Sequence, residues 1–397
     1  MIPDLREAFN RSFTEKKYHE FLNDLDSKHP GAIQFRVAET PVFVPKSFEK
    51  KILDACESIV DIILDSDFKG LTERAIPEKE RVPGDDGHPE FIAFDFGLCL
   101  NENGQYEPQL IEMQGFPTLF GFQVYYPEVI RKHFNIPENF SQYLNGYNKK
   151  TYTELLKRIV IDDHAPENVI LLEVKPHEQK TKIDFYCTQD LLGIPIVGLE
   201  ELKKEGRKLF YEKNGKRIPV ERIYNRIIFD DFNHIKDSLG EIVDITQPLD
   251  VEWVPHPNWF YRISKFTLPY INHPYVPETF FLNEVSEIPA NLDQYVLKPL
   301  FSFAGQGVII DVKLSDIQKI KDPEHWILQK KVHYAEAIKT PDEPVKAEIR
   351  IFYFWEKNKK RPVAVCNLAR LSKGKMIGVR YNADKDWVGG SVVFFEQ

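Results

Sequence analysis

One segment in the last third of the chain constrains the fold more than any other. Across residues 295–311, an apolar run leads to Lys298 and Pro299, a glycine-containing loop follows at 301–307, and a second apolar run comes next. Glycines let backbone N–H groups approach an anion closely, and a lysine beside them can neutralise phosphate oxygens. The pattern predicts a β-hairpin that holds the phosphates of a nucleotide. A plain hairpin with a surface lysine would show the same pattern.

The carboxylates that would complete such a site by holding a metal lie far earlier in the chain. Asp95 and Glu112 each sit within an otherwise apolar strand pattern, and residues 101–104 (Asn-Glu-Asn-Gly) supply a turn between the two strands. On paired strands, Asp95, Glu112 and Gln114 can face one cleft. Their oxygens are hard ligands that suit Mg²⁺ better than zinc. The alternative is a hairpin whose acidic residues simply face water.

Further candidates for nucleotide binding flank the glycine loop. Lys265 is a candidate second phosphate lysine, and residues 325–332 form a strand that runs into a short connector able to present backbone groups to adenine. Read alone, each has a plainer explanation, namely a solvated lysine and an edge strand. The candidate nucleotide-binding residues are therefore Lys265, Lys298, Ser302, Gly305, Gln306, Gly307, Gln329, Lys331 and Val332.

Charged residues also alternate near the end of the chain. Residues 347–353 place Glu348 and Arg350 on one face of a strand, while Arg370 and Arg380 lie on the next two predicted strands. If these strands pair, the arginines and the carboxylate line one surface of a sheet. The alternative is a set of cross-strand salt bridges, each contributing little to stability.

Composition excludes several classes of protein. With 397 residues, 42% hydrophobic and 28% charged, the chain is predicted to be an ordinary soluble globular protein. The formal net charge of −9 argues against nucleic-acid binding, and no apolar run approaches the ~20 residues of a membrane span. The four cysteines form no C-x-x-C pair, and no signal peptide is evident at the start of the sequence. We therefore expect a cytoplasmic protein without a nucleic-acid or membrane partner.

The character of the predicted elements changes along the chain. The first part mixes a helix with strands, the middle alternates strand, helix and strand as in a parallel βαβ unit, and the last part is antiparallel. The helices are predicted over 48–64 and 184–192, the latter ending at Gly193. The strands are predicted over 89–97, 109–114, 168–174, 194–198, 222–228, 279–282, 294–298, 307–312, 326–330, 346–355, 362–370 and 375–380.

Taken in order, the rear motifs resemble those of the ATP-grasp superfamily, whose members hold ATP between two β-containing lobes. The resemblance rests on Lys265, the Val-Leu-Lys-Pro strand containing Lys298, its glycine loop, and the Leu-Gln-Lys-Lys-Val connector at 328–332. It continues with the Glu-Ile-Arg motif at 348–350, Arg370 and the glycine pair at 389–390.

In that family an aspartate and a Glu-x-Asn-x-x-Pro signature follow these motifs. Here Asp95 and the sequence Glu-Met-Gln-Gly-Phe-Pro at 112–117 look like the same stretch moved to the front. Gln114 stands where the family has a metal-binding asparagine, so the side chain is one methylene longer. The chain therefore resembles circularly permuted ATP-grasp proteins such as eukaryotic-type glutathione synthetases and glutathionylspermidine synthase-like proteins.

The resemblance implies an α+β ATP-grasp fold in permuted order, with a small parallel α/β pre-ATP-grasp domain. The implied segments are a permuted part of the ATP-grasp lobe carrying the metal-binding acids, the pre-ATP-grasp domain, the nucleotide lobe and the remaining core strands. Their ranges are 1–150, 151–260, 261–335 and 336–397.

The implied activity is an ATP- and Mg²⁺-dependent ligase that joins a carboxylate of a small molecule or peptide to an amine or thiol through an acyl phosphate. Asp95, Glu112 and Gln114 would hold the metal. Arg370 or Arg350 would stabilise the transferred phosphate, and Arg226, at the end of a middle strand, would meet substrate or phosphate. A nucleotide-binding protein without ligase activity and an ATP-grasp phosphotransferase are the alternatives.

Overall fold

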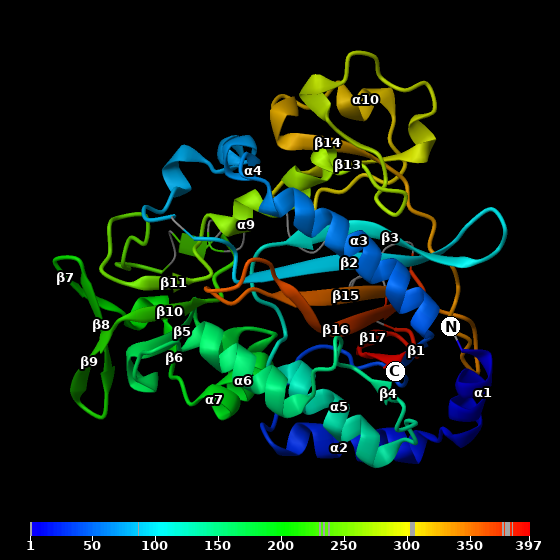
Figure 1. The fold of residues 1–397 in the computed structure, drawn as a ribbon, viewed down its shortest axis with the longest axis horizontal. Helices are drawn as coiled ribbons and strands as arrows, with labels where there is room; N and C mark the ends of the chain where they lie inside the picture. The colour runs from blue at the N-terminus through cyan, green and yellow to red at the C-terminus, as the bar shows by residue number, and fades with distance from the viewer. Residues whose placement is uncertain are drawn as a thin grey trace.

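A five-stranded antiparallel sheet forms the centre of the protein, as a computed structural model shows (Figure 1). The structure describes residues 2–85, 87–229, 232, 235–236, 239–301, 306–374, 377, 382 and 384–397. The strand order of the central sheet is β17-β16-β15-β2-β3. In chain order these strands are β2 (Phe91–Leu100), β3 (Tyr106–Gln114), β15 (Lys346–Phe354), β16 (Val363–Ser372) and β17 (Gly389–Ser391).

This sheet joins strands from distant parts of the sequence. β2 pairs with β3 through a turn in which Gly104 takes a φ of 71°, and β2 pairs on its other side with β15, where Arg350 lies opposite Asp95. The early hairpin is therefore built into the sheet formed by the end of the chain. This pairing brings the strand that carries Asp95 beside the strand that carries Arg350, as a site shared by the front and rear motifs would require.

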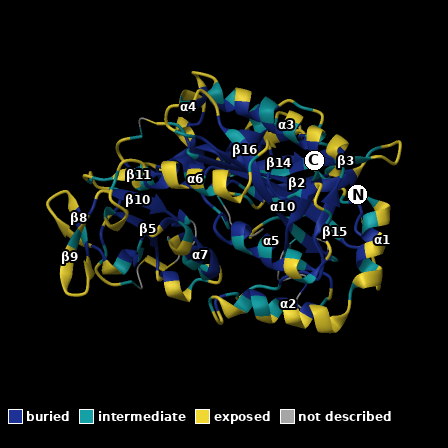
Figure 2. Ribbon diagram, turned by 60° about the horizontal axis from the view of Figure 1, so that its bottom comes forward, coloured by how far each residue is buried: buried dark blue, intermediate teal, exposed yellow. Residues whose placement is uncertain are grey.

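Both faces of the central sheet are covered, which explains why β2 is buried along nearly its whole length. Helix α3 (Lys46–Leu64) lies on one face, where the Tyr353 hydroxyl donates a hydrogen bond of 2.8 Å to Glu57. On the opposite face, Phe120 packs against the rings of Phe352 and Phe354. Figure 2 shows the resulting buried layer inside a shell of exposed helices and turns.

A smaller parallel sheet lies beside the central one, with strand order β11-β10-β5-β6. Its strands are β5 (Val169–Glu173), β6 (Ile196–Gly198), β10 (Arg222–Asn225) and β11 (Glu252–Val254), and helices α6 (Lys149–Val160) and α7 (Lys182–Leu192) belong to the same region. Every residue of β5 is buried, as expected for an apolar run inside a parallel sheet. Gly193 ends α7 in the left-handed conformation, as predicted.

A third lobe carries the lysine hairpin. It is a three-stranded antiparallel sheet in the order β12-β14-β13, formed by β12 (Thr279–Phe281), β13 (Tyr295–Pro299) and β14 (Trp326–Lys330). Leu282, Tyr295, Leu297, Val312 and Leu328 form its small core. In Figure 1 this lobe stands above the central sheet, with α10 (Leu314–Ile317) at its outer side.

The remaining elements complete the edges. A three-stranded sheet pairs β1 (Val42–Val44) in parallel with β18 (Val393–Glu396), which in turn pairs with β4 (Phe140–Ser141), and a separate meander consists of β7 (Lys203–Glu205), β8 (Lys208–Lys213) and β9 (Lys216–Val220). The other α-helices among the described residues are α1 (Pro3–Ser12), α2 (Glu15–Ser27), α4 (Phe68–Leu71), α5 (Phe122–His133) and α9 (Trp259–Arg262). Among the described helices, none combines the length and apolarity needed to cross a lipid bilayer.

The structure corrects several predicted elements. The predicted strand 307–312 is reduced to a single bridge between Leu297 and Ile309, because Gly307 turns the backbone at a φ of 72°. The predicted strand 222–228 ends at Asn225. The predicted strand 375–380 falls almost entirely outside the described residues. The structure bears out the mixed α+β class, while the division into four segments stays a prediction.

Candidate functional site

The predicted metal residues lie on adjacent strands. Asp95 on β2 is directly opposite Glu112 on β3, and Gln114 follows two positions later, opposite Ala93; the irregularity in the register lies between Asp95 and Phe96. The side chain of Glu112 is 36% exposed, whereas that of Asp95 is only 1% exposed. The two acids therefore differ in environment although they are neighbours across the ladder.

Asp95 is the centre of a buried ionic row. One of its oxygens accepts a hydrogen bond from Arg350 Nε, and the other accepts from Arg350 Nη2 and Arg370 Nη2, each at 2.5 Å. Arg370 also pairs with Glu348, whose other oxygen accepts a hydrogen bond of 2.9 Å from the Tyr334 hydroxyl. The predicted surface lined by Glu348, Arg350 and Arg370 therefore exists, but Asp95 is part of it. Arg380 lies outside the described residues.

The two buried carboxylates of this row respond differently to burial. Burial raises the pKa of Asp95, but the charges of Arg350 and Arg370 outweigh it and hold that pKa below its usual value. For Glu348 burial prevails over the attraction of Arg370, and its pKa is raised. Negative charge in the row is therefore concentrated on Asp95, where both guanidinium groups converge.

The two predicted phosphate lysines are both buried. Lys298 Nζ donates to Gln329 Oε1 at 2.6 Å and to the carbonyl of Ile111 at 3.2 Å, which places this ammonium beside the strand that carries Glu112. Lys265 begins a 3₁₀ helix (Lys265–Tyr270), and its Nζ lies 3.5 Å from the carbonyl oxygen of Leu300.

Burial is the main reason why the pKa of Lys298 is lowered to about 8, and the charge of Lys265 lowers it further. The charges of Glu112 and Glu348 act in the opposite direction. Two ammonium groups close enough for the charge of Lys265 to lower the pKa of Lys298 form a suitable site for a polyanion, because an anion relieves their repulsion.

A small pocket of about 50 Å³ brings the front and rear residues together. Glu112 and Gln114 line it from β3, Lys265 lines it from the 3₁₀ helix, and Leu300 and Phe301 line it from the start of the glycine loop. The amide nitrogen of Gln114 donates to the Phe116 carbonyl at 3.2 Å, so this side chain is oriented within the pocket wall. The pocket therefore contains a carboxylate and an amide from β3 together with an ammonium group from the 3₁₀ helix.

The glycine loop itself is described only in part. Ser302 and Gly305 lie outside the described residues, while Gln306 and Gly307 are exposed. Gln329 lies directly against Lys298, whereas Lys331 Nζ donates to the carbonyl of Asp293 at 2.6 Å. Val332 follows the end of β14 and is partly buried.

Arg226 lies away from this pocket, just beyond the end of β10 in the parallel sheet. It is buried and pairs with Asp184 in the first turn of α7, and the same carboxylate accepts backbone hydrogen bonds of 2.8 and 2.9 Å from Gly121 and Phe122. Arg226 thus helps to anchor the segment that follows β3. The structure does not bring it together with the lysines or the acids of the central sheet.

Sequence reasoning missed two residues that orient the arginines. Tyr334 bonds Glu348, and the Thr118 hydroxyl accepts a hydrogen bond of 3.3 Å from Arg350. Thr118 follows the six-residue motif at 112–117, so its proximity to the motif was a usable signal. Tyr334 lies in a connector without any regular pattern, and only the tertiary structure identifies it.

The donor set suits Mg²⁺ only in part. Among the described residues there is no group of three or more histidine, cysteine, aspartate or glutamate side chains placed to hold a metal ion. Magnesium is commonly held by one or two carboxylates together with substrate phosphates, so Glu112 and Gln114 beside two lysines fit this ion. Asp95 fits less directly, because two arginines already occupy its oxygens.

Comparison with known proteins relates this chain to others through its fold. No protein-family model and no curated protein sequence matches it. Its structure is similar to that of a glutathione synthetase-like effector (GSS30) from Globodera pallida in the apo form, with a TM-score of 0.59. The match covers 97% of this chain and 98% of the other, at 11% sequence identity. At that identity the similarity establishes that the two chains share a fold and nothing about activity.

Proposed function

We propose that this protein is an ATP- and Mg²⁺-dependent ligase with a circularly permuted ATP-grasp fold. It would join the carboxylate of a small molecule or peptide to an amine or thiol through an acyl phosphate. The observation that carries the proposal is the pocket in which Glu112 and Gln114 meet Lys265, with the buried ammonium of Lys298 beside them. The glutathione synthetase-like architecture supports it.

In this proposal the lysines and the metal-binding side chains act on the negative charge of the nucleotide in different ways. Lys265 and Lys298 neutralise phosphate oxygens, and Glu112 and Gln114 hold Mg²⁺, which would neutralise charge on the bridged phosphates. Phosphoryl transfer needs positioning and charge neutralisation more than a protein nucleophile. A buried pair of ammonium groups opposite a carboxylate supplies both.

The arginines of the central sheet supply the remaining positive charge. Arg350 and Arg370 are held in place by Asp95 and Glu348, so little reorganisation is needed before they face a developing negative charge. Asp95 is proposed as the residue that orients both guanidinium groups, and as a third metal ligand. Arg226 is proposed to act through the segment that it anchors.

A second candidate function is nucleotide binding without ligase activity. The full engagement of Asp95 by two arginines favours it, because a metal site limited to Glu112 and Gln114 holds its ion with fewer charged ligands. Both functions use the same pocket, so binding measurements alone do not separate them.

Incubation with ATP, Mg²⁺, hydroxylamine and a panel of amino acids and small peptides separates the two functions. A ligase produces ADP and a hydroxamate, because hydroxylamine captures the acyl phosphate, whereas a binding protein retains intact ATP. A stable phosphorylated product would instead identify a phosphotransferase.

Replacing Lys298 or Glu112 with alanine tests the roles of the pocket residues. Each aligned group of this kind is typically worth ~3 kcal/mol, so we expect ADP formation to fall about a hundredfold in either variant. Lys330→Ala is the matched control, because Lys330 is on the same strand as Gln329 but exposed. Normal turnover by Lys298→Ala and Glu112→Ala would contradict the assignment.

A further inference from the structure

A large open cavity lies at the other end of the parallel sheet. Its volume is about 890 Å³, and it is lined by the first residues of two strands, Arg222 of β10 and Glu252 of β11. Ligands of open α/β sheets usually bind at the carboxyl ends of the strands, so this cavity is not part of such a site. The segment 256–265 separates it from the lysine pocket, since His256 and Trp259 line the cavity while Ser264 and Lys265 line the pocket.

The positive side chains around the cavity already have acidic partners. Arg158 pairs with Glu356 at 2.7 Å, Lys357 pairs with Asp162 at 3.9 Å, and Arg222 pairs with Glu252. The fourth basic residue of the lining, Arg207, is 2.8 Å from Asp250. An anionic ligand would therefore have to displace a carboxylate from each cation that it approached.

Two buried polar atoms of the lining have no hydrogen-bond partner among the described residues. One is Oε2 of Glu90, at the entrance to β2, and the other is the indole nitrogen of Trp259, a side chain that is only 2% exposed. Buried polar atoms are nearly always paired, and leaving one unpaired costs free energy. A carboxyl and an indole N–H that share a cavity wall are complementary to a ligand with both a donor and an acceptor.

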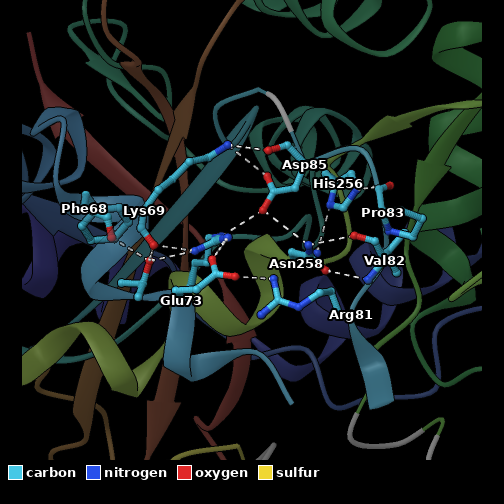
Figure 3. Close-up of polar contacts among 11 residues, drawn as sticks. Phe68, Lys69, Glu73, Arg81, Val82, Pro83, Asp85, His256 and Asn258 are labelled. Carbon is cyan, nitrogen blue, oxygen red and sulfur yellow. Dashed lines mark hydrogen bonds and ion pairs between the residues drawn. The ribbon is translucent and has the colours of Figure 1, made fainter. Parts of the chain in front are cut away.

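Polar contacts hold this part of the wall rigid (Figure 3). Asn258 bonds both backbone groups of Val82 at 3.0 Å, and His256 Nε2 contacts the carbonyl of Pro83 at 3.2 Å. The carboxylate of Asp85 forms ion pairs with Arg262 Nε at 3.0 Å and with Lys69 Nζ at 3.2 Å. These hydrogen bonds and ion pairs therefore connect the loop that contains Val82 and Pro83 to the helix that contains Trp259. Such connections preorganise the site for a ligand.

We propose that this cavity binds a small organic cation in which an ammonium group, bound by Glu90, is joined to a hydrogen-bond acceptor that the Trp259 indole contacts. The ring of Trp253, which also lines the cavity, favours an ammonium group as well, whereas Lys69 Nζ and Arg262 Cζ already lie 5.4 and 5.9 Å from the centroid of the Trp259 ring. Amino alcohols are the simplest compounds of this class. The inference does not depend on the proposed function.

The protonation of Glu90 gives this site a characteristic pH dependence. Burial is the main reason why the pKa of Glu90 is raised to about 8; the negative charge of Asp85 acts in the same direction, whereas the backbone N–H of Glu90, Arg222 and Lys357 act in the opposite direction. An ammonium ligand binds the ionised carboxylate. Affinity in the wild-type protein should therefore increase as the pH rises from about 6 to 8, with a proton released on binding.

The test follows the tryptophan indole resonances of protein carrying ¹⁵N-labelled tryptophan, without ATP. The chain has five tryptophans, so Trp259→Phe assigns the relevant resonance. The probes are an aminobutanol and its shorter and longer homologues, which carry an ammonium group. Two comparison compounds replace that ammonium group: butanediol carries a hydroxyl at the same position, and hydroxybutyrate carries a carboxylate there. We expect a saturable shift of the Trp259 resonance with one of the amino alcohols only.

Substitutions then locate the cation. Glu90→Gln should weaken binding of that amino alcohol at least about tenfold, since it removes the charge with little change of shape. Glu356→Gln is the matched control from the same cavity. Its affinity for the amino alcohol should stay within about threefold of the wild-type value, because Glu356 already forms an ion pair with Arg158. The other indole resonances report whether either variant is folded. If Glu90→Gln is misfolded, the pH dependence of the wild-type protein provides the test.

The proposal is overturned if no amino alcohol shifts the Trp259 resonance, or if hydroxybutyrate shifts it equally well. It is also overturned if Glu90→Gln binds as the wild type does, or if affinity is flat between about pH 6 and 8.

Discussion

Lys298 has the most informative environment of any single residue in the candidate site. Its ammonium group is buried, hydrogen-bonded to Gln329, and close enough to Lys265 for the two charges to repel. Because its pKa is lowered to about 8, a part of the molecules lacks this charge slightly above neutral pH. The residue therefore links nucleotide affinity to pH.

We expect ATP affinity to decline as the pH rises through about 8, by up to about tenfold for each further unit, because only the charged lysine attracts phosphate. Calorimetry in buffers of different ionisation enthalpy should detect proton uptake on binding near this pH. Lys298→Arg keeps its charge, so its affinity should be flat over the same range. The same decline in Lys298→Arg would show that another group is responsible.

Asp95 shows where residue-level prediction from the sequence reaches its limit. A carboxylate inside an apolar strand correctly indicated a special environment, and strand alternation indicated the surface shared by Glu348, Arg350 and Arg370. The sequence could not show that Arg350 lies opposite Asp95, because the register between β2 and β15 is set by tertiary packing. Whether Asp95 binds metal stays a prediction.

At the level of elements, the sequence predicted those turns, helices and strands that are specified by neighbouring residues alone. The turn at 101–104, the helix within Lys46–Leu64 and the buried run in β5 are confirmed, since a turn sequence or an apolar period specifies each. Short strands such as β1 and β18 were missed because each is only three or four residues long and pairs with a remote partner. The predicted second strand of the glycine hairpin, at 307–312, does not form because the backbone turns at Gly307.

The segment after β3 is the element on which the site depends most closely. Gly121 N donates to Asp184, and a Cβ added at Gly121 would meet the backbone nitrogen and the hydroxyl of Thr188 at 2.7 Å. At Gly115 an added Cβ would lie 2.6 Å from the Trp259 carbonyl oxygen. These two glycines let the segment fit between the parallel sheet and the candidate pocket.

Gly121→Ala should therefore destabilise the protein by about 1–3 kcal/mol, because backbone and side chain must move to admit the methyl group. Thermal unfolding followed by circular dichroism measures the loss. Gly70→Ala is the control: Gly70 lies in a helix with open space around it, so alanine should be neutral or slightly stabilising there. Equal melting temperatures for both variants would contradict the close packing at Gly121.

For the whole molecule, the central sheet is the feature that unites the chain. β15 pairs with β2 over seven positions, from Glu348 to Phe354. Without the early hairpin, β15 would therefore have no strand paired along this edge. The first and the last of the four predicted segments therefore contribute strands to one sheet.

A chain restricted to residues 151–397 should fail to fold, since it exposes the edge of β15 and the apolar faces that α3 covers. Size-exclusion chromatography and circular dichroism should show aggregated material without a cooperative melt. Supplying residues 1–150 as a second chain should restore soluble, folded protein. A monomeric, cooperatively melting 151–397 fragment would refute this dependence.

The parallel pairing of β1 with β18 has a consequence for synthesis in the cell. Residues 42–44 leave the ribosome long before residues 393–396, and at 5–20 residues per second the early strand waits many seconds for its neighbour. During translation the nascent hairpin that carries Asp95 has no guanidinium partner and no completed core to shield it. We therefore expect this polypeptide to rely on chaperones that bind incomplete chains, more than a protein whose domains close one after another.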